Sequence, residues 1–192
     1  GFYKLSSVID LSNRFNVCLI APGPYGHDQH DDLVTHNALF QWYGATNSNV
    51  ILLHNTIGAK IENISINCRD IAGTRGIAFG ADATASSIVK AVSVSNIEVS
   101  HCDIGIRLGD VAANGPDIAS NFFETVYLHH NISQGLSQNS GNGVAYFYNL
   151  LTTCNGVSPA GGRQGVNVYA EGGSVDLYSY VGIGEGSCKP AG

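Results

Sequence analysis

The sequence predicts an all-β fold, a single-stranded right-handed parallel β-helix of about six to eight coils and three sheets. The first observation is a strand phrase that returns at residues 60–68, 93–100 and 121–128. The second is that the spacing between copies drifts, from 33 residues (96 − 63) to 29 residues (125 − 96). The third is composition, because 24 glycines and only 12% charged residues are typical of a chain with many tight turns.

The three copies place apolar residues in the same positions. Superposing Asn63, Asn96 and Thr125 aligns three apolar columns: Ile61, Val94 and Phe123; Ile64, Ile97 and Val126; and Ile66, Val99 and Leu128. Apolar and polar residues alternate around these columns with the period of two that strands have. Each coil is therefore expected to bury one face against its neighbours.

The remaining elements follow from short apolar runs between clusters of Gly, Ser and Asn. Before the repeated phrase we expect strands at 3–11, 16–20, 38–42 and 50–53, with a polar excursion over 22–36. Second strands of later coils are expected at 76–80 and 105–109, and further strands at 144–151, 166–169 and 175–180. No stretch has the pattern of an amphipathic helix of ten or more residues.

The chain length predicts one domain, residues 1–192. The sequence has no Met and opens directly on a strand phrase at Gly1, so we interpret it as a piece of a longer chain. The net charge of −6 with nine Lys and Arg residues argues against a nucleic-acid partner, which needs clustered cations. Apolar runs are only a few residues long, so neither a membrane span nor a targeting peptide is predicted.

The five cysteines leave the redox state open. Cys68, Cys102 and Cys154 each end a strand phrase, and they would stack in one interior column if residues 100–101 form a one-residue bulge. Buried free thiols are the favoured interpretation. Disulfides are the alternative, and the odd count leaves at least one thiol over.

The first residues resemble a known family. Residues 1–11 are similar to the opening coil of pectate-lyase-like right-handed β-helices, and Asn16-Val17-Cys18-Leu19 looks like that family's N-V-x-L strand. The Gly-Ile-x-x-Gly and Asn-Ile-x-Ile phrases extend the resemblance over most of residues 1–185. The family contains polysaccharide lyases, glycoside hydrolases and phage tailspike or tail-fibre proteins. The chain departs from it in lacking the N-terminal cap and in the long excursion after Ala21.

The catalytic motifs of the pectin-cleaving members are mostly absent. Of the polygalacturonase-type set N-T-D, D-D, G-H-G and R-x-K, only Asp31-Asp32 matches, in a loop far from the middle coils. The pectate-lyase R-x-P-x-x-R arrangement is absent too. A plant-pectin enzyme is therefore disfavoured, whereas tailspike-type hydrolases share no motif and stay open.

Outward-facing strand positions supply the candidate site. Glu98 and Glu124 are expected on adjacent coils, offset by one pleat, at a separation like that of glycosidase carboxylates. One would act as general acid and the other as base or nucleophile. Tyr127 would offer a ring face to a sugar, with His129 beside it. Solvated residues of an outer sheet are the alternative reading.

A second group of charges follows the strands. Asp70 and Asp103 lie at equal distance after theirs, 33 residues apart (103 − 70), with Arg69 and Arg107 nearby. They form either a surface ladder of ion pairs or the floor of an acidic-sugar site, with Asp103 catalytic and the arginines binding a uronate. The segment 26–32 holds the densest set of metal-ligand types and could take calcium, but its spacing matches no known loop. No metal or cofactor is therefore expected, with calcium the exception that segment leaves open.

Together these patterns predict an extracellular or virion-borne protein of the tailspike or tail-fibre type that recognises a surface polysaccharide or another glycan. It would be a homotrimer by the same resemblance, and a polysaccharide hydrolase or lyase if it is an enzyme. The alternative is a non-catalytic structural stalk or adhesin. A groove with paired carboxylates and exposed aromatics would favour the enzyme, and evenly polar coils would favour the spacer.

Overall fold

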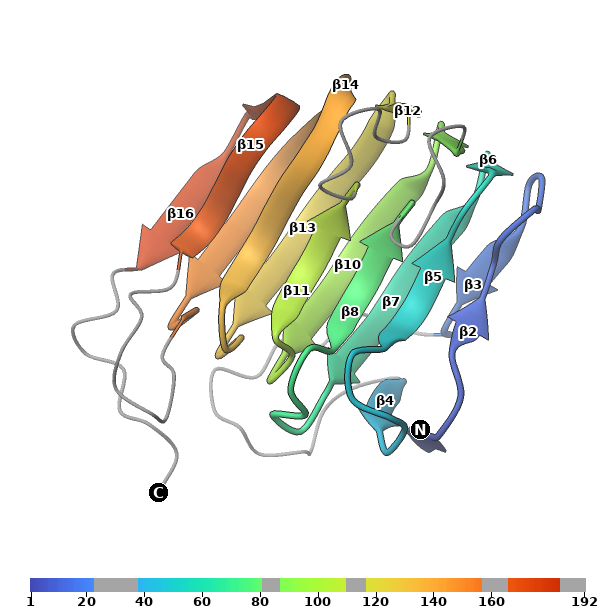
Figure 1. The fold of residues 1–192 in the computed structure, drawn as a ribbon, viewed down its shortest axis with the longest axis vertical. Coiled ribbons are helices and arrows are strands. Elements are labelled where there is room, and N and C mark those ends of the chain that lie inside the picture. The colour runs from blue at the N-terminus through green and yellow to red at the C-terminus, as the bar shows by residue number, and fades with distance from the viewer. Residues whose placement is uncertain (23–37, 81–86, 110–116, 157–165, 184–192) are drawn as a thin grey trace.

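The computed structural model describes residues 1–22, 38–80, 87–109, 117–156 and 166–183. These residues form an all-β parallel solenoid of about 4 turns, built from three parallel sheets. The turns follow one another in chain order from one end of the solenoid to the other (Figure 1). The described residues contain no helix, as the sequence pattern indicates.

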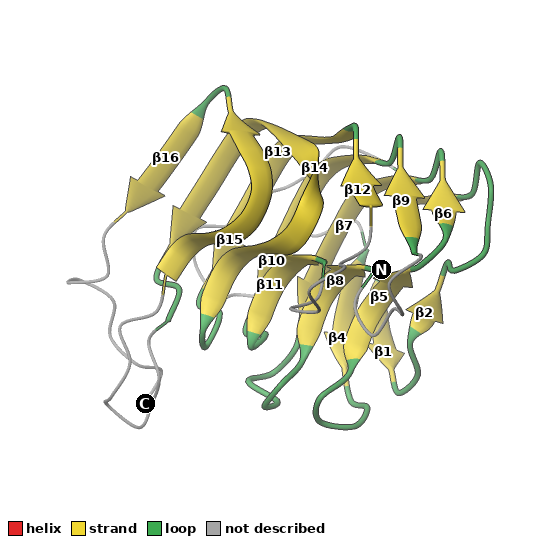
Figure 2. Ribbon diagram, turned by 45° about the horizontal axis from the view of Figure 1, so that its top comes forward, coloured by secondary structure: helices red, strands yellow, loops and turns green. Residues whose placement is uncertain are grey.

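The strands stack in three rows (Figure 2). The first row contains β1 (Phe2–Leu5), β4 (Leu39–Trp42), β7 (Lys60–Asn67), β10 (Ser93–Ser100), β13 (Asn121–His129), the second half of β14 (Gln134–Thr153) and β16 (Tyr180–Ile183), and β3 (Cys18–Ile20) joins it beside β7. The second row contains β2 (Ile9–Asp10), β5 (Asn49–Leu53), β8 (Arg75–Phe79), β11 (Ile104–Leu108), the first part of β14, and β15 (Val166–Leu177), whose later residues also pair with the second half of β14. The third row contains β6 (Thr56–Ile57), β9 (Ile88–Lys90) and β12 (Asp117–Ala119).

A left-handed residue bends four strands of the first row at their middle, namely β7, β10, β13 and the second half of β14. Asn63, Asn96, Thr125 and Asn149 have φ values of 60°, 53°, 54° and 60°. Each bend resets the alternation of side chains, which explains why inward positions fall three residues apart across it. Asn tolerates this conformation better than most residues. The Asn96 Nδ2 group also donates a hydrogen bond to Asn63 Oδ1 at 3.1 Å, so the bends are joined from coil to coil.

The three apolar columns predicted from the repeat are buried inside the solenoid. Register pairs the copies as aligned, with Ile61 opposite Val94 and Val94 opposite Phe123. Further along the axis, Phe123 stacks on Phe147 with ring centroids 4.3 Å apart. The interior is thus a continuous apolar core that runs the length of the solenoid.

A second interior column of side chains begins with a disulfide and continues with hydrogen-bonded asparagines. Cys68 and Cys102 form a disulfide between adjacent coils, so the interpretation of these two as free thiols is wrong. The column continues through buried Asn131, which accepts from the Cys102 backbone N–H at 3.1 Å and donates to Asn155 Oδ1 at 2.8 Å. Cys154 precedes Asn155 and is outside this column, and it is disulfide-bonded too. Cys18 is a free, exposed thiol.

The turn count is about 4, lower than the expected six to eight. The excursion after Ala21 interrupts a single rung, because β3 and β4 both pair with β7. Ala21 N–H donates to Glu62 O at 3.0 Å, and Ser65 N–H donates to Ala38 O at 2.9 Å. The chain therefore leaves the sheet beside one end of the Asn63 bend and rejoins it beside the other.

Candidate functional site

Glu98 points outward from β10 yet is buried. The residue is 4% exposed, and both carboxylate oxygens are bonded. Ser65 Oγ donates to Oε2 at 3.0 Å from the preceding coil. His129 Nε2 lies 2.8 Å from Oε1 on the following coil, and His129 is itself 6% exposed. The Glu98 carboxylate is thus bonded to both neighbouring coils, and these bonds join the outward faces of three successive coils.

If Glu98 is ionised and the ring of His129 is neutral, the hydrogen bonds allow one arrangement of protons. His129 then donates from Nε2 to the carboxylate, which leaves its Nδ1 as an acceptor in the neutral ring. The Nδ1 atom of His130 lies 2.9 Å from that Nδ1, so His130 is the donor of this pair. The order of donation is His130 to His129 to Glu98.

Further aromatic and acidic groups surround these two imidazoles. The ring of Tyr127 stacks on His129 with centroids 4.3 Å apart, and His101 stacks on His130 at 5.6 Å. The Nδ1 atom of His101 lies 3.2 Å from Oδ1 of Asp70. The structure therefore brings the predicted residues Glu98, Tyr127 and His129 together.

This cluster does not form a nucleophilic triad. Ser65 Oγ donates to the carboxylate of Glu98, so the imidazole of His129 is not placed to remove its proton. Glu98 and His129 are also nearly inaccessible, which limits their contact with a polymer. The arrangement favours a structural role, holding three coils together through polar side chains.

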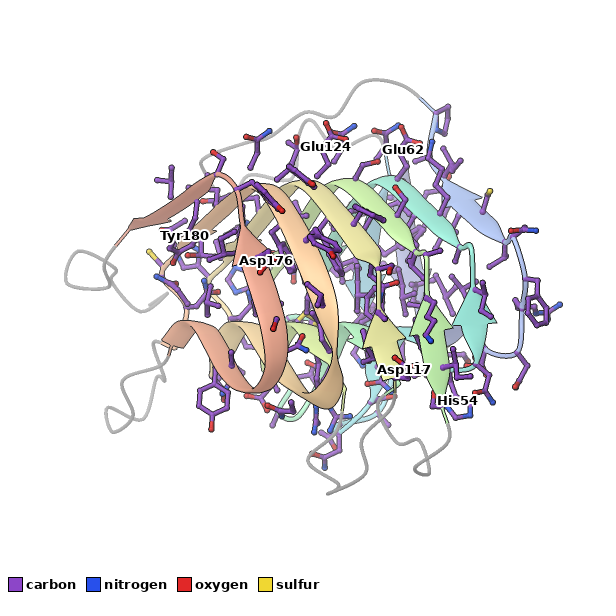
Figure 3. The ribbon with its side chains drawn as sticks, turned by 90° about the horizontal axis from the view of Figure 1, so that it is seen from above. His54, Glu62, Asp117, Glu124, Asp176 and Tyr180 are labelled. Carbon is purple, nitrogen blue, oxygen red and sulfur yellow. A yellow bond between two sulfur atoms is a disulfide. The ribbon has the colours of Figure 1, made fainter. Side chains whose placement is uncertain are left out.

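Glu124 lies apart from this cluster. It is opposite Ser95, whereas Glu98 is opposite Tyr127, so register places the two carboxylates three residues apart along the strand. The expected offset of one pleat is therefore wrong, because the left-handed bend at Asn96 and Thr125 falls between them. Glu124 is exposed. Figure 3 shows Glu124 and Glu62 projecting from one side of the solenoid, opposite Asp117 and His54.

The second predicted group is dispersed. Asp103 accepts a hydrogen bond from Ser133 Oγ on the next coil. Arg107 is buried on β11 and its Nε donates to Gly109 O at 3.1 Å. The guanidinium of Arg69 lies 4.1 Å from the ring centroid of Tyr43. These contacts place the two arginines on different partners.

Exposed aromatic side chains cluster near Glu124, a feature that sequence reasoning missed. Phe122 stacks on Tyr146 with ring centroids 5.2 Å apart and planes 17° apart, and Tyr148 stacks on Tyr178 at 4.6 Å and 9°. Tyr146 and Tyr178 join the two pairs at 6.5 Å. We call Phe122, Tyr146, Tyr148 and Tyr178 the aromatic ladder.

Three residues of the ladder are exposed, Tyr146 is half-buried, and the ladder has acidic neighbours. Phe122 is 45% exposed and Tyr178 is 60% exposed. Asp176 pairs in register with Tyr146, and Glu124 with Tyr148. Partial desolvation raises the pKa of Tyr178 above its usual value of 10.0, and repulsion from Tyr148, Asp176 and Tyr146 adds to the effect. Large exposed apolar clusters of this kind mark binding surfaces.

The sequence pattern indicates three of the four residues of the aromatic ladder but not the fourth. Phe122, Tyr146 and Tyr148 occupy outward positions on two neighbouring strands, which a sheet-face analysis could find. Tyr178 joins them only through the register of a third coil, which the repeat does not fix.

The segment 26–32, considered above as a calcium loop, lies outside the described residues. Within the part of the chain that is described, no group of three or more His, Cys, Asp and Glu side chains is placed to hold a metal ion. No described segment is a helix long and apolar enough to cross a membrane. Comparisons with protein-family models, curated proteins and solved structures gave no match.

Proposed function

We propose that this chain is a glycan-recognising β-solenoid of the tailspike or tail-fibre type. The observation that carries the proposal is the aromatic ladder, which presents exposed rings on the outer face of the first row of strands. Sugar rings have apolar C–H faces that pack on aromatic rings, and their hydroxyls bond to carboxylates at the edge. Glu124 and Asp176 supply such carboxylates beside the ladder.

A depolymerase activity is the enzymatic form of this proposal. Glu124 is the one of the two candidate carboxylates that a polymer could reach, because Glu98 is buried. Glycoside hydrolysis needs a second acid or base within about 10 Å of the first. Asp176 is the carboxylate to test with it, two coils away and two residues earlier in register. Register spaces the two Cα atoms by about 12 Å, so cleavage would need the two side chains to reach toward each other. Binding without cleavage is what the ladder supports best.

The proposal includes an extracellular or virion-surface location. The Cys68–Cys102 disulfide and the bonded Cys154 support it, because disulfides persist in oxidising surroundings. It also includes a trimer, for which the exposed Tyr180 and Val181 on β16 offer an apolar contact. Light scattering of the purified chain measures the subunit number directly.

A structural stalk or adhesin is the second candidate, and one observation favours it. The interior column that starts at Cys68–Cys102 and continues through Asn131 and Asn155 joins four successive coils by covalent and polar bonds. Such a column stiffens a solenoid whatever its surface binds. A spacer needs no ligand, so a binding assay would detect no glycan bound to the aromatic ladder.

A glycan array tests the proposed function. The purified chain is expected to bind a defined set of oligosaccharides, and Tyr178→Ala is expected to lower the signal by about tenfold. Exposed Tyr43 is the matched control, because its ring lies under Arg69 outside the ladder. Release of reducing ends tests hydrolysis, and ultraviolet absorbance of unsaturated products tests a lyase. An array with no bound glycan would favour the stalk.

A further inference from the structure

One ring face of Phe122 is not covered by the aromatic ladder. Tyr146 packs on the face toward the following coil, at 5.2 Å. This distance is too short for rings lying side by side, so the two rings stand face to face across neighbouring strands. The opposite face of Phe122 is turned toward the preceding coil, where register places the small side chain of Ser93. The 45% exposure of Phe122 is consistent with an accessible face there.

Polar groups surround this face on the same side of the sheet. Glu124 follows Phe122 by two residues, so both side chains point outward from β13, and both are exposed. Ser95 is opposite Glu124 on the preceding coil. One coil further, Glu62 is opposite Ser95 and is held by Lys60 at 2.5 Å. Register thus places Ser93 opposite the ring, with the Glu124 carboxylate and the Ser95 hydroxyl two residues along the strands.

The charge balance of these neighbours selects among sugars. The Lys60–Glu62 pair is neutral as a unit, so the Glu124 carboxylate leaves the surroundings with one negative charge. A carboxylate accepts hydrogen bonds from sugar hydroxyls strongly, because the acceptor is charged. The same carboxylate repels a uronate or another acidic sugar. The cation in register with this face is Lys60, which is opposite Ser93 and is paired with Glu62.

We propose that the free face of Phe122 is a stacking site for an uncharged pyranose ring. Glu124 accepts from the hydroxyls of that sugar, and the hydroxyls of Ser93 and Ser95 complete its hydrogen bonds. Acidic glycans are excluded by the charge of Glu124. This inference rests on the glycan-recognising function proposed above and adds the substrate class and the residues that select it.

Matched oligosaccharides test the selection for charge. Calorimetry on the whole chain compares the affinity for each neutral oligosaccharide with the affinity for the same molecule oxidised to a carboxyl group at C6. The neutral set contains cellohexaose, laminarihexaose, maltohexaose and the neutral oligosaccharides found on the array. The wild type is expected to bind a neutral oligomer at least about tenfold more tightly than its oxidised form. Equal or tighter binding of the oxidised form would overturn the inference while leaving glycan recognition intact.

Variants then test the residues. Phe122→Ala is expected to weaken neutral binding by about tenfold, and Phe122→Tyr to keep it within about threefold. Glu124→Gln is expected to weaken neutral binding by about fivefold and to strengthen binding of the oxidised form, a reversal that a structural defect would not produce. Phe15→Ala is the matched control, because Phe15 is an exposed ring at the other end of the solenoid. Circular dichroism checks that each variant is folded.

The outcomes separate the two proposals. Unchanged neutral binding by Phe122→Ala, with a wild type that binds glycans, would overturn the stacking site alone. A change of subunit number in Phe122→Ala without loss of glycan binding would assign the ring to a contact between copies of the chain. A wild type that binds no glycan at all would refute the proposed function, and this inference with it.

Discussion

The carboxylate of Glu98 lies 2.8 Å from Nε2 of His129, and this bond joins the outward faces of two successive coils. Outward residues of a solenoid are usually solvated, whereas these two are buried. A buried carboxylate is stable only when its oxygens are bonded, as both are here. The pair therefore matters for stability before any question of chemistry.

Replacing Glu98 should show this role. Glu98→Ala is expected to lower the free energy of unfolding by about 3 kcal/mol, because it leaves the buried donors of Ser65 and His129 without their acceptor. Glu98→Gln keeps an acceptor oxygen and should cost about half as much. Urea unfolding measures both, with exposed Glu124→Gln as the control. An Ala variant as stable as the wild type would contradict the structural role.

Removing the Cys68–Cys102 disulfide should destabilise the chain strongly. The bond links residues 34 apart in sequence, so it restricts the unfolded chain considerably. The double variant Cys68→Ala/Cys102→Ala is expected to lose about 4 kcal/mol in urea unfolding without reductant. Cys18→Ala removes a free, exposed thiol and should have little effect. A loss below about 1 kcal/mol in the double variant would show that the bridge is not needed.

Among the four residues at the left-handed bends, Thr125 is the one least suited to a positive φ. Its φ is 54°, a conformation that β-branched residues rarely adopt. Thr125→Asn is expected to raise the free energy of unfolding by about 1–2 kcal/mol, because Asn tolerates this φ and could extend the amide bonds of Asn63 and Asn96. Thr125→Gly relieves the strain without the amide and separates the two effects. Thermal unfolding of both variants decides, and a destabilised Asn variant would contradict the explanation.

Tyr178 should titrate later than an ordinary tyrosine. Its pKa is raised above 10.0 by partial desolvation and by repulsion from Tyr148, Asp176 and Tyr146. Because the folded chain favours the neutral phenol, this contribution to stability is complete below pH 10.0 and is lost as the pH rises through the folded-state pKa. Ultraviolet titration should show a late component that Tyr178→Phe removes and Asp176→Asn moves to lower pH. A titration without a late component would contradict the stacking of the ladder.

The repeat predicted the core because burial inside a solenoid depends on the alternation within one strand. Ile64 and Ile97 are equivalent by sequence and by register for that reason. The outer face was harder to predict. The pattern shows that Glu98 points outward, but its burial depends on side chains of neighbouring coils such as His129. Tyr178 likewise reaches the ladder through register over three coils, which local patterns do not determine.

The position of the excursion after Ala21 has a consequence for how this architecture varies. The chain departs and returns beside a single bend of the adjoining rung, with Ala21 and Ala38 each bonded to β7. The pairing of this rung with β7 is therefore made by β3 and β4, on either side of the excursion. Segments of different length and composition could be exchanged at this position. The solenoid could then act as a scaffold whose binding specificity changes while its interior residues stay the same.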